Sequence, residues 1–322
     1  MEKRVREQPA KLQDTYIRNL KRGSSHMRIG ALEAGGTKMV CAIGDENGKI
    51  EMRVSYPTKT PGETMPKIIE FFGGGKIDAL GIGCFGPVDL NRHSPAYGYI
   101  TSTPKLAWAD YNIVGAFVGA LKVPVGFDTD VNGAVLGEVV FGAARGCDTA
   151  IYITVGTGVG VGVYANGALL HGLVHPEAGH VLVTKREGDS YRGKCPYHAN
   201  CLEGLAAGPA IMERWGKPAA ELADREEVWE LESDYIAQAV TNYILTLSPQ
   251  KVILGGGVMH QEQMFPLVRK KVLDKLNFYL KNDILLKHIG DYIVPPMLGD
   301  DAGITGALLL GRQEAQRQAA AG

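Results

Sequence analysis

A unit of two apolar strands joined by a glycine turn occurs twice in this chain, at residues 28–43 and 149–165. The first unit reads RIGAL, EAGGTK, MVCAI, and the second reads TAIYITV, GTG, VGVGVYA. Segments with alternating strand and helix patterns follow each unit, which indicates an internal duplication of an α/β arrangement. The predicted fold is therefore α/β, with two similar domains that face each other across a cleft.

The domain boundaries follow from this repeat. We place the small N-terminal domain at 27–142 and the larger domain at 143–300, with the last helix, about 301–318, packed back on the first domain. Residues 84–105 lack a helical period and are expected to form an irregular loop over the cleft. Hydrophobic periodicity and capping signals predict helices at about 62–73, 113–121, 130–141, 208–215, 226–247, 262–279 and 301–316, and further strands at 78–84, 123–127 and 251–257.

The chain has 322 residues and a net charge of −1, which gives no bulk electrostatic reason to expect nucleic-acid or membrane binding. No apolar run approaches the roughly 18 residues that a membrane helix needs. The five cysteines are an odd number without a secretory signal, which favours a reducing compartment, so we expect a cytoplasmic protein. Residues 1–26 are read as a tag or disordered tail, because GSSHM at 23–27 is typical of an expression vector.

Three glycine turns follow apolar strands, and glycine lets backbone N–H groups approach phosphate oxygens closely. Each turn alone indicates only a tight turn, but three of them in two repeated halves favour nucleotide binding. Lys38 offers a charge to a phosphate, or lies on an exposed strand face. The turns are Gly35-Gly36-Thr37-Lys38, Gly156-Thr157-Gly158 and Gly255-Gly256-Gly257.

Two common nucleotide motifs are excluded. The chain has no G-x-x-x-x-G-K-[ST], the phosphate-binding P-loop. A G-x-G-x-x-G does occur at Gly81, Gly83 and Gly86, but Pro87 and a segment without helical period follow it. A dinucleotide fold needs a helix there, so an NAD-dependent enzyme is kept only as a minor alternative.

A cluster of metal-ligand residues reads H-x14-C-x2-H-x2-C, from His180, Cys195, His198 and Cys201. Three ligands within one short loop and a fourth before it suit tetrahedral Zn²⁺, and four protein ligands leave no open position for catalysis. The spacing therefore predicts a structural zinc site. The alternative is a pair of surface histidines with free thiols.

Several motifs together resemble the ROK family of repressors and sugar kinases, which has the actin-like ATPase fold of two ribonuclease H-like domains. They are EAGGTK, GPVD, TDVN, the PEAGH box and CPYHANC. The similarity runs from about residue 28 to the end and points to the bacterial fructokinase branch. It implies ATP-dependent phosphorylation of a hexose with Mg²⁺, and a homodimer. Glu33 stands where the family has Asp, and His198 where it usually has Cys.

The resemblance also implies the catalytic residue. Asp130 matches the aspartate base of the family's N-D-x-N pattern, and phosphoryl transfer to a hydroxyl uses such a carboxylate. Thr129 replaces the family's Asn, which touches a sugar hydroxyl, and this moves the expected substrate from glucose toward fructose. From the local sequence alone, Asp128, Thr129 or Asp130 could equally cap a helix.

The remaining site residues are also implied by resemblance. Glu177, His180 and Glu203 are expected to face the sugar, with Thr129 and Asp130, and His180 to divide its two nitrogens between zinc and sugar. Lys105 is expected to meet the sugar or the transferred phosphate, or to be an exposed loop lysine. ATP contacts are expected from Gly35, Gly36, Thr37, Lys38, Thr157, Gly158, Pro209, Gly256 and Gly257.

The preferred function is an ATP-dependent fructokinase. Glucokinase, mannokinase and N-acetylmannosamine kinase activities stay as alternatives. A sugar-responsive repressor is less favoured, because only 26 residues precede Met27 and they lack the two-helix pattern of a DNA-binding domain.

Overall fold

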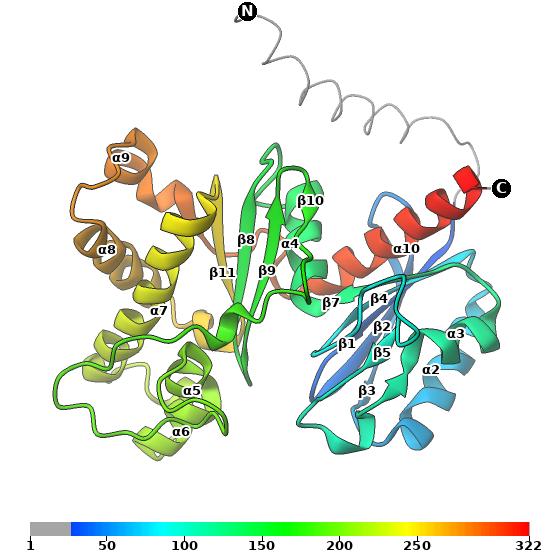
Figure 1. Ribbon diagram of the computed structural model, residues 1–322, viewed down its shortest axis with the longest axis horizontal. Helices are drawn as coiled ribbons and strands as arrows, with labels where there is room; N and C mark the ends of the chain where they lie inside the picture. The colour runs from blue at the N-terminus through cyan, green and yellow to red at the C-terminus, as the bar shows by residue number, and fades with distance from the viewer. Residues whose placement is uncertain (1–26, 322) are drawn as a thin grey trace, which may run out of the picture.

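The computed structural model describes residues 27–321. It has two lobes, each built on a five-stranded sheet, and helices α4 (Asp130–Val140) and α10 (Ala302–Ala321) lie where the lobes meet (Figure 1). The tail predicted at 1–26 lies outside the described residues. Within them, no helix is long and apolar enough to cross a membrane.

The first sheet has the order β3-β2-β1-β4-β7. Strands β1, β2 and β3 are antiparallel to one another in sequence order, whereas β4 and β7 extend the sheet in parallel from β1. The strands are β1 (Ile29–Ala34), β2 (Lys38–Gly44), β3 (Ile50–Pro57), β4 (Ala79–Cys84) and β7 (Val125–Thr129).

The second sheet has the order β10-β9-β8-β11-β12 and the same strand directions. The two sheets therefore repeat one topology, as the repeated sequence unit predicts. The strands are β8 (Ala150–Val155), β9 (Val159–Ala165), β10 (Ala168–Leu169), β11 (Lys251–Gly255) and β12 (Ile293–Val294).

Both sheets are covered on two faces, which explains why their central strands are apolar throughout. Leu32 of β1 packs in the core under α2 and α3, whereas Ala31 faces α10. In β8, Ile153 faces the core that contains α7, and Tyr152 faces α4. The other helices are α2 (Pro61–Gly75), α3 (Ile113–Leu121), α5 (Leu202–Ala206), α6 (Gly208–Trp215), α7 (Glu226–Leu247), α8 (Met264–Leu276) and α9 (Asp283–Tyr292).

The two helices between the lobes approach each other most closely at glycines. A Cβ on Gly306 of α10 would lie 1.7 Å from the carbonyl oxygen of Gly133 in α4. Gly81 has the same role under α10, because its Cβ would lie 1.8 Å from the carbonyl oxygen of Ala307. The glycines of the G-x-G-x-x-G are thus explained by packing, and no helix begins after them.

The predicted elements agree with the structure over most of the chain. The strand predicted at 251–257 ends at Gly255, and the helix predicted at 262–279 spans Met264–Leu276. The strand predicted at 123–127 runs from Val125 to Thr129, so Asp128 and Thr129 belong to it. Helices α5 and α9 were not predicted. The loop predicted at 84–105 is irregular for most of its length, but Tyr99–Ile100 pairs as β5 with β6 (Tyr111–Asn112).

Candidate functional site

Asp130 begins α4 directly after β7, at the edge where the parallel strands of the first sheet end. Burial raises the pKa of its carboxyl to about 7, with a further rise from Glu33 and a smaller one from Glu177. The N–H of Val131 donates to Asp130 Oδ1 at 2.9 Å and opposes that rise. A carboxyl with this pKa can accept and release a proton near neutral pH, as a general base must.

Thr129 caps helix α4. Its Oγ1 accepts from the N–H of Asn132 at 3.1 Å, and its side chain is buried. Among the three capping candidates left open by the sequence, the structure thus gives the cap to Thr129. Asp130 is left as the first helical residue.

Asp128 and Asn132 form a buried network that sequence reasoning did not assign. Asp128 Oδ1 accepts from Asn132 Nδ2 at 2.7 Å, and Asn132 Oδ1 accepts from the N–H of Val163 in β9 at 3.2 Å. The contact joins the two lobes beside Asp130. The sequence feature that could have indicated this network is Asn132, the final residue of TDVN. The assignment of Asp130 as base gives no role to this asparagine.

The first glycine turn, between β1 and β2, is held by Thr58. Its Oγ1 donates to the carbonyl oxygen of Gly35 at 2.7 Å, and its N–H donates to Thr37. The side chain of Lys105 lies over this turn, since a Cβ on Gly36 would be 2.9 Å from Lys105 Cε. Lys105 is therefore placed with the turn that was predicted to bind phosphate, and Lys38 is exposed at its end.

Glu33 is the last charged residue of β1 before this turn. Burial raises its pKa, and Arg53 and Lys38 oppose the rise. Its carboxylate lies against the start of α10, where a Cβ on Gly303 would be 2.7 Å from Glu33 Oε1. The structure thus puts a second carboxyl near Asp130 at the base of the turn.

The other two glycine turns lie together in the second lobe. The N–H of Gly208 donates to the carbonyl oxygen of Gly156 at 2.7 Å, which brings Gly208-Pro209 at the start of α6 against the second turn. A Cβ on Gly156 would lie 3.9 Å from the nitrogen of Gly257 in the third turn. Gly256 has φ of 89°, which only glycine adopts without strain. Thr157, Gly158, Pro209, Gly256 and Gly257 are therefore brought to one region.

Glu203 lies between the second turn and His180. Its Oε2 accepts from the N–H of Val159 at 3.0 Å, and its Oε1 is 3.8 Å from His180 Nε2. The structure gives this carboxylate a backbone partner at the turn, in addition to the sugar role expected from the resemblance. Glu177 is different, because its side chain is 47% exposed and lies beside the loop after β4.

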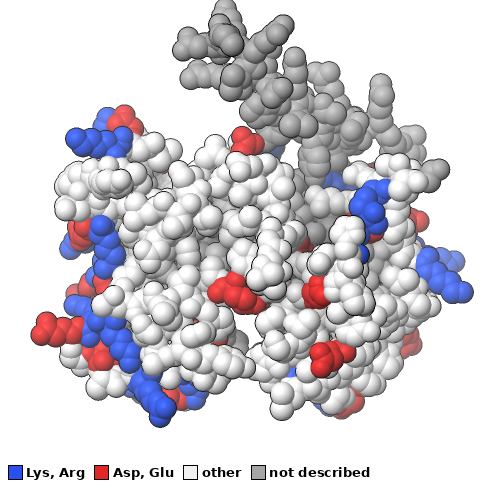
Figure 2. Space-filling view, viewed as in Figure 1, with Lys and Arg blue, Asp and Glu red and all other residues white. Residues whose placement is uncertain are grey.

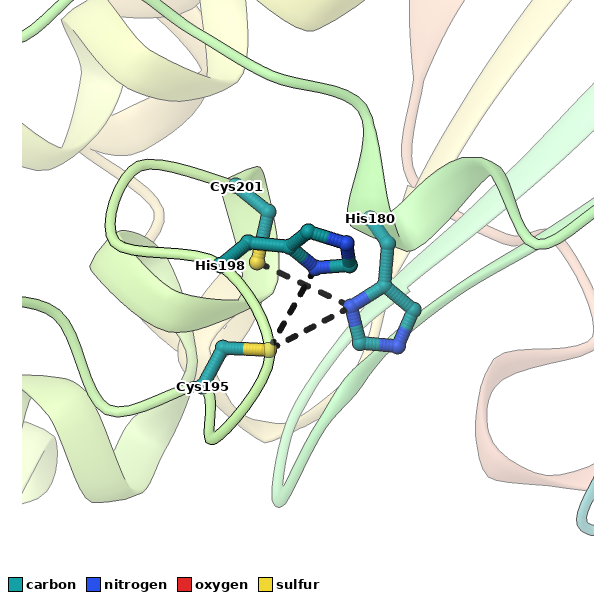
Figure 3. Close-up of side chains that lie close together, drawn as sticks. All are labelled: His180, Cys195, His198 and Cys201. Atoms are coloured by element: carbon teal, nitrogen blue, oxygen red, sulfur yellow. Dashed lines mark hydrogen bonds between the residues drawn. The ribbon is translucent and has the colours of Figure 1, made fainter. Parts of the chain in front are cut away.

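Four potential metal ligands converge beside α5 (Figure 3). Cys195, His198 and Cys201 come from the loop before this helix, and His180 comes from a short 3-10 helix, Ala178–His180. The ligand atoms of the four residues all lie within 4.8 Å of one another. Cys195 Sγ is 3.8 Å from His180 Nδ1 and 3.6 Å from His198 Nδ1, and Cys201 Sγ is 3.6 Å from His180 Nδ1. Zinc bonds of roughly 2.0–2.3 Å at tetrahedral angles separate ligand atoms by roughly 3.3–3.8 Å. The donor set and its spacing therefore fit Zn²⁺.

A cavity of about 900 Å³ lies away from these residues, between β7, α10 and the β9–β10 hairpin. His171 Nε2 lies 2.8 Å from Asp128 Oδ2 in its wall, and this contact raises the pKa of His171. None of the residues predicted to bind sugar, ATP or zinc lines it.

Charged side chains of both signs are interspersed over the face of the molecule that Figure 2 shows.

Comparison with known proteins decides the family, because the ROK family model matches residues 29–314. The chain belongs to the ROK family. A Bacillus subtilis (strain 168) protein whose name includes the word fructokinase is 53% identical over 91% of this chain and 98% of its own length. The fructokinase of Pediococcus pentosaceus is 46% identical over 88% of this chain and 97% of its own. The ROK hexokinase structure from Thermus thermophilus has a TM-score of 0.72 at 25% identity, and covers 90% of this chain and all of that one. The ROK fold thus accounts for both mixed sheets.

Proposed function

We propose that this ROK protein is a fructokinase that transfers the terminal phosphoryl group of ATP to a hydroxyl of fructose. The observation that carries the proposal is Asp130, a carboxyl with a pKa of about 7 at the carboxyl edge of the first sheet. The named fructokinases that match along nearly their whole length support the choice of sugar.

Asp130 accepts the proton of the attacking hydroxyl in this proposal. Glu177 binds sugar hydroxyls as an exposed carboxylate, and Thr129 orients Asp130 by capping α4. Lys105 lies over Gly36, which suits a lysine that neutralises the transferred phosphoryl group. The three glycine turns hold the nucleotide phosphates through backbone N–H groups.

Mg²⁺ supplies charge neutralisation of the phosphates when it is bound. Glu33 is the residue that we expect to hold it, directly or through water, because its carboxyl is buried next to the first turn. Oxygen ligands of this kind suit Mg²⁺.

A structural zinc ion is the second inferred group. His180, Cys195, His198 and Cys201 would hold it, and Glu203 would orient His180 through the other ring nitrogen. The site would fix the loop that carries Glu203 and the start of α5.

We also infer two ribonuclease H-like domains, 27–142 with the last helix and 143–300. The packing of α10 on β1, β4 and β7 supports the assignment of the last helix. A homodimer is expected from the resemblance. A cytoplasmic location agrees with five free cysteines.

An assay of ADP release across fructose, glucose, mannose and N-acetylmannosamine tests the proposal. We expect fructose to give the highest kcat/KM. Absence of ADP release with all four sugars would contradict kinase activity, and a preference for another hexose would contradict only the choice of fructose.

A further inference from the structure

His175 is a buried histidine in the wall of the proposed sugar site. It lies in the loop between β10 and the PEAGH segment, and only 3% of its surface is exposed. The N–H of Val88, from the loop after β4 in the first lobe, donates to His175 Nε2 at 3.1 Å. This hydrogen bond crosses from one lobe to the other.

The Val88 contact fixes the tautomer of the imidazole. A ring nitrogen that accepts from an N–H carries no proton, so the neutral ring holds its proton on Nδ1. His175 Nδ1 is buried and has no hydrogen-bond partner. Buried donors without a partner are uncommon in folded proteins, so this N–H points to an interaction that the free protein does not complete.

Glu177 is the acceptor beside that donor. Its Oε1 lies 3.6 Å from His175 Nδ1, just beyond hydrogen-bond length, and its side chain is half exposed. A small rotation of this carboxylate closes the distance. Hydrogen bonds in active sites are often long in the free enzyme and shorten when substrate binds.

Gly86 leaves the space that both side chains occupy. A Cβ on Gly86 would lie 3.1 Å from His175 Cε1 and 3.3 Å from Glu177 Oε1. These contacts are tight, so the two side chains would have to shift by a few tenths of an ångström. The loop after β4 therefore contributes to the placement of His175 and Glu177 in two ways. The N–H of Val88 bonds to His175, and Gly86 leaves room for both side chains.

We propose that His175 is a positioning residue that donates from Nδ1 to Glu177 and aims this carboxylate at the hydroxyls of the bound sugar. The inference rests on the proposed function, in which Glu177 binds the sugar. One carboxylate oxygen held by His175 leaves the other free to accept from the sugar. Because Val88 belongs to the first lobe, the aim of Glu177 also depends on how the lobes are placed.

The test is a double-mutant cycle between His175→Gln and Glu177→Ala, which removes the acceptor, measured as KM and kcat for the sugar and for ATP. The glutamine amide oxygen at 175 can still accept from Val88, but the donor at the Nδ1 position is lost. We expect His175→Gln to raise the sugar KM about tenfold in the wild-type background, the size of one positioned hydrogen bond, with an unchanged ATP KM. In the Glu177→Ala background the same substitution should change the sugar KM less than about twofold.

An equal loss in both backgrounds would overturn the proposal, because His175 would then act without Glu177. The matched control is His93→Gln, an exposed histidine outside the site, which should leave both KM values unchanged. If His175→Gln lowers the yield of folded protein, Gly86→Ala replaces it, since the added Cβ would crowd both His175 and Glu177 and so disturb their pairing. Gly86→Ala must raise the sugar KM without changing that for ATP, and an unchanged sugar KM would contradict the proposal.

The sugar panel separates this inference from the proposed function. An enzyme that phosphorylates another hexose in place of fructose overturns only the choice of fructose, and the cycle is then measured with that hexose. If the enzyme phosphorylates fructose normally but the effects of the two substitutions on the sugar KM are additive, only the role of His175 is overturned.

Discussion

At the scale of single residues, the pKa of Asp130 is set first by burial and then by neighbouring carboxyls, of which Glu33 has the larger effect. Burial and Glu33 raise the pKa of Asp130 from an ordinary value of 3.8 to about 7, so the proton stays on this group to a higher pH than on an exposed aspartate. The protonated form cannot accept the proton of a sugar hydroxyl. We therefore predict that kcat/KM for the sugar rises with pH, with a midpoint of about 7, in assays at constant ionic strength.

Glu33→Gln provides the matched variant for this profile. Glu33 raises the pKa of Asp130, so its neutral replacement should move the midpoint to lower pH. A wild-type midpoint near that of a free aspartate, about 4, would show that burial does not act on the base.

A second prediction concerns Thr129 and the preference of the enzyme between glucose and fructose. Asn caps helices as well as Thr does, so Thr129→Asn should keep α4 intact while it restores the amide that the family uses on a sugar hydroxyl. We expect the ratio of glucose to fructose kcat/KM to rise at least about tenfold, the size of one hydrogen bond to substrate. An unchanged ratio with an unchanged melting temperature would remove Thr129 from substrate choice.

Residues in local motifs could be predicted from the sequence, and residues paired over long distances could not. The four metal-ligand residues were singled out by their spacing, whereas Asp130 was proposed as the base through the family resemblance, because the local sequence also allowed a helix cap. His175 and Val88 are 87 positions apart, and Glu203 and Val159 are 44 apart, so no spacing rule connects them. Only the buried or bonded state of each side chain in the structure reveals these contacts.

At the scale of elements, the predicted helices agree closely where they are long and periodic. Helix α7 was predicted with its observed ends, because it has 22 residues and a repeating apolar face. Helix α5 has only five residues and follows Cys201, whose Sγ accepts from the N–H of Gly204. Such a helix depends on the loop before it, which propensity alone does not describe.

The loop before α5 contains three of the four proposed zinc ligands, so zinc content can be tested there. Purified protein should hold about one zinc per chain, and Cys195→Ser should lose most of it, because three ligands hold zinc more weakly than four. Zinc is measured by mass spectrometry after dialysis, together with the melting temperature. Cys147→Ser is the control, since Cys147 is a free cysteine outside the cluster. Equal zinc in both variants would contradict the site.

At the scale of the whole molecule, α4 and α10, the two helices that lie where the lobes meet, cross closely at glycines. Gly306→Ala should destabilise the protein by about 3 kcal/mol, because its Cβ would overlap the carbonyl oxygen of Gly133 and separate α10 from α4. Denaturant unfolding measures this. Gly119→Ala is the control, a helical glycine of α3 with open space around it, and it should be neutral or slightly stabilising. Equal stability of the two variants would contradict the role of this crossing.

The repeated sheet topology was predictable at this scale, because each half carries the same order of strand, glycine turn and strand. The crossing of α4 and α10 was not, since glycines within helices give no sign of which partner they meet. Gly133 and Gly306 are explained only once both helices are placed.

The most direct test of the account compares the wild type with Asp130→Asn for phosphorylation of fructose and for binding of fructose. Asparagine has nearly the shape of aspartate but cannot accept the proton. We predict that kcat falls at least about 10³-fold, while the Kd for fructose, measured by calorimetry, changes less than about threefold. A variant that phosphorylates fructose at near wild-type rates would contradict Asp130 as the base.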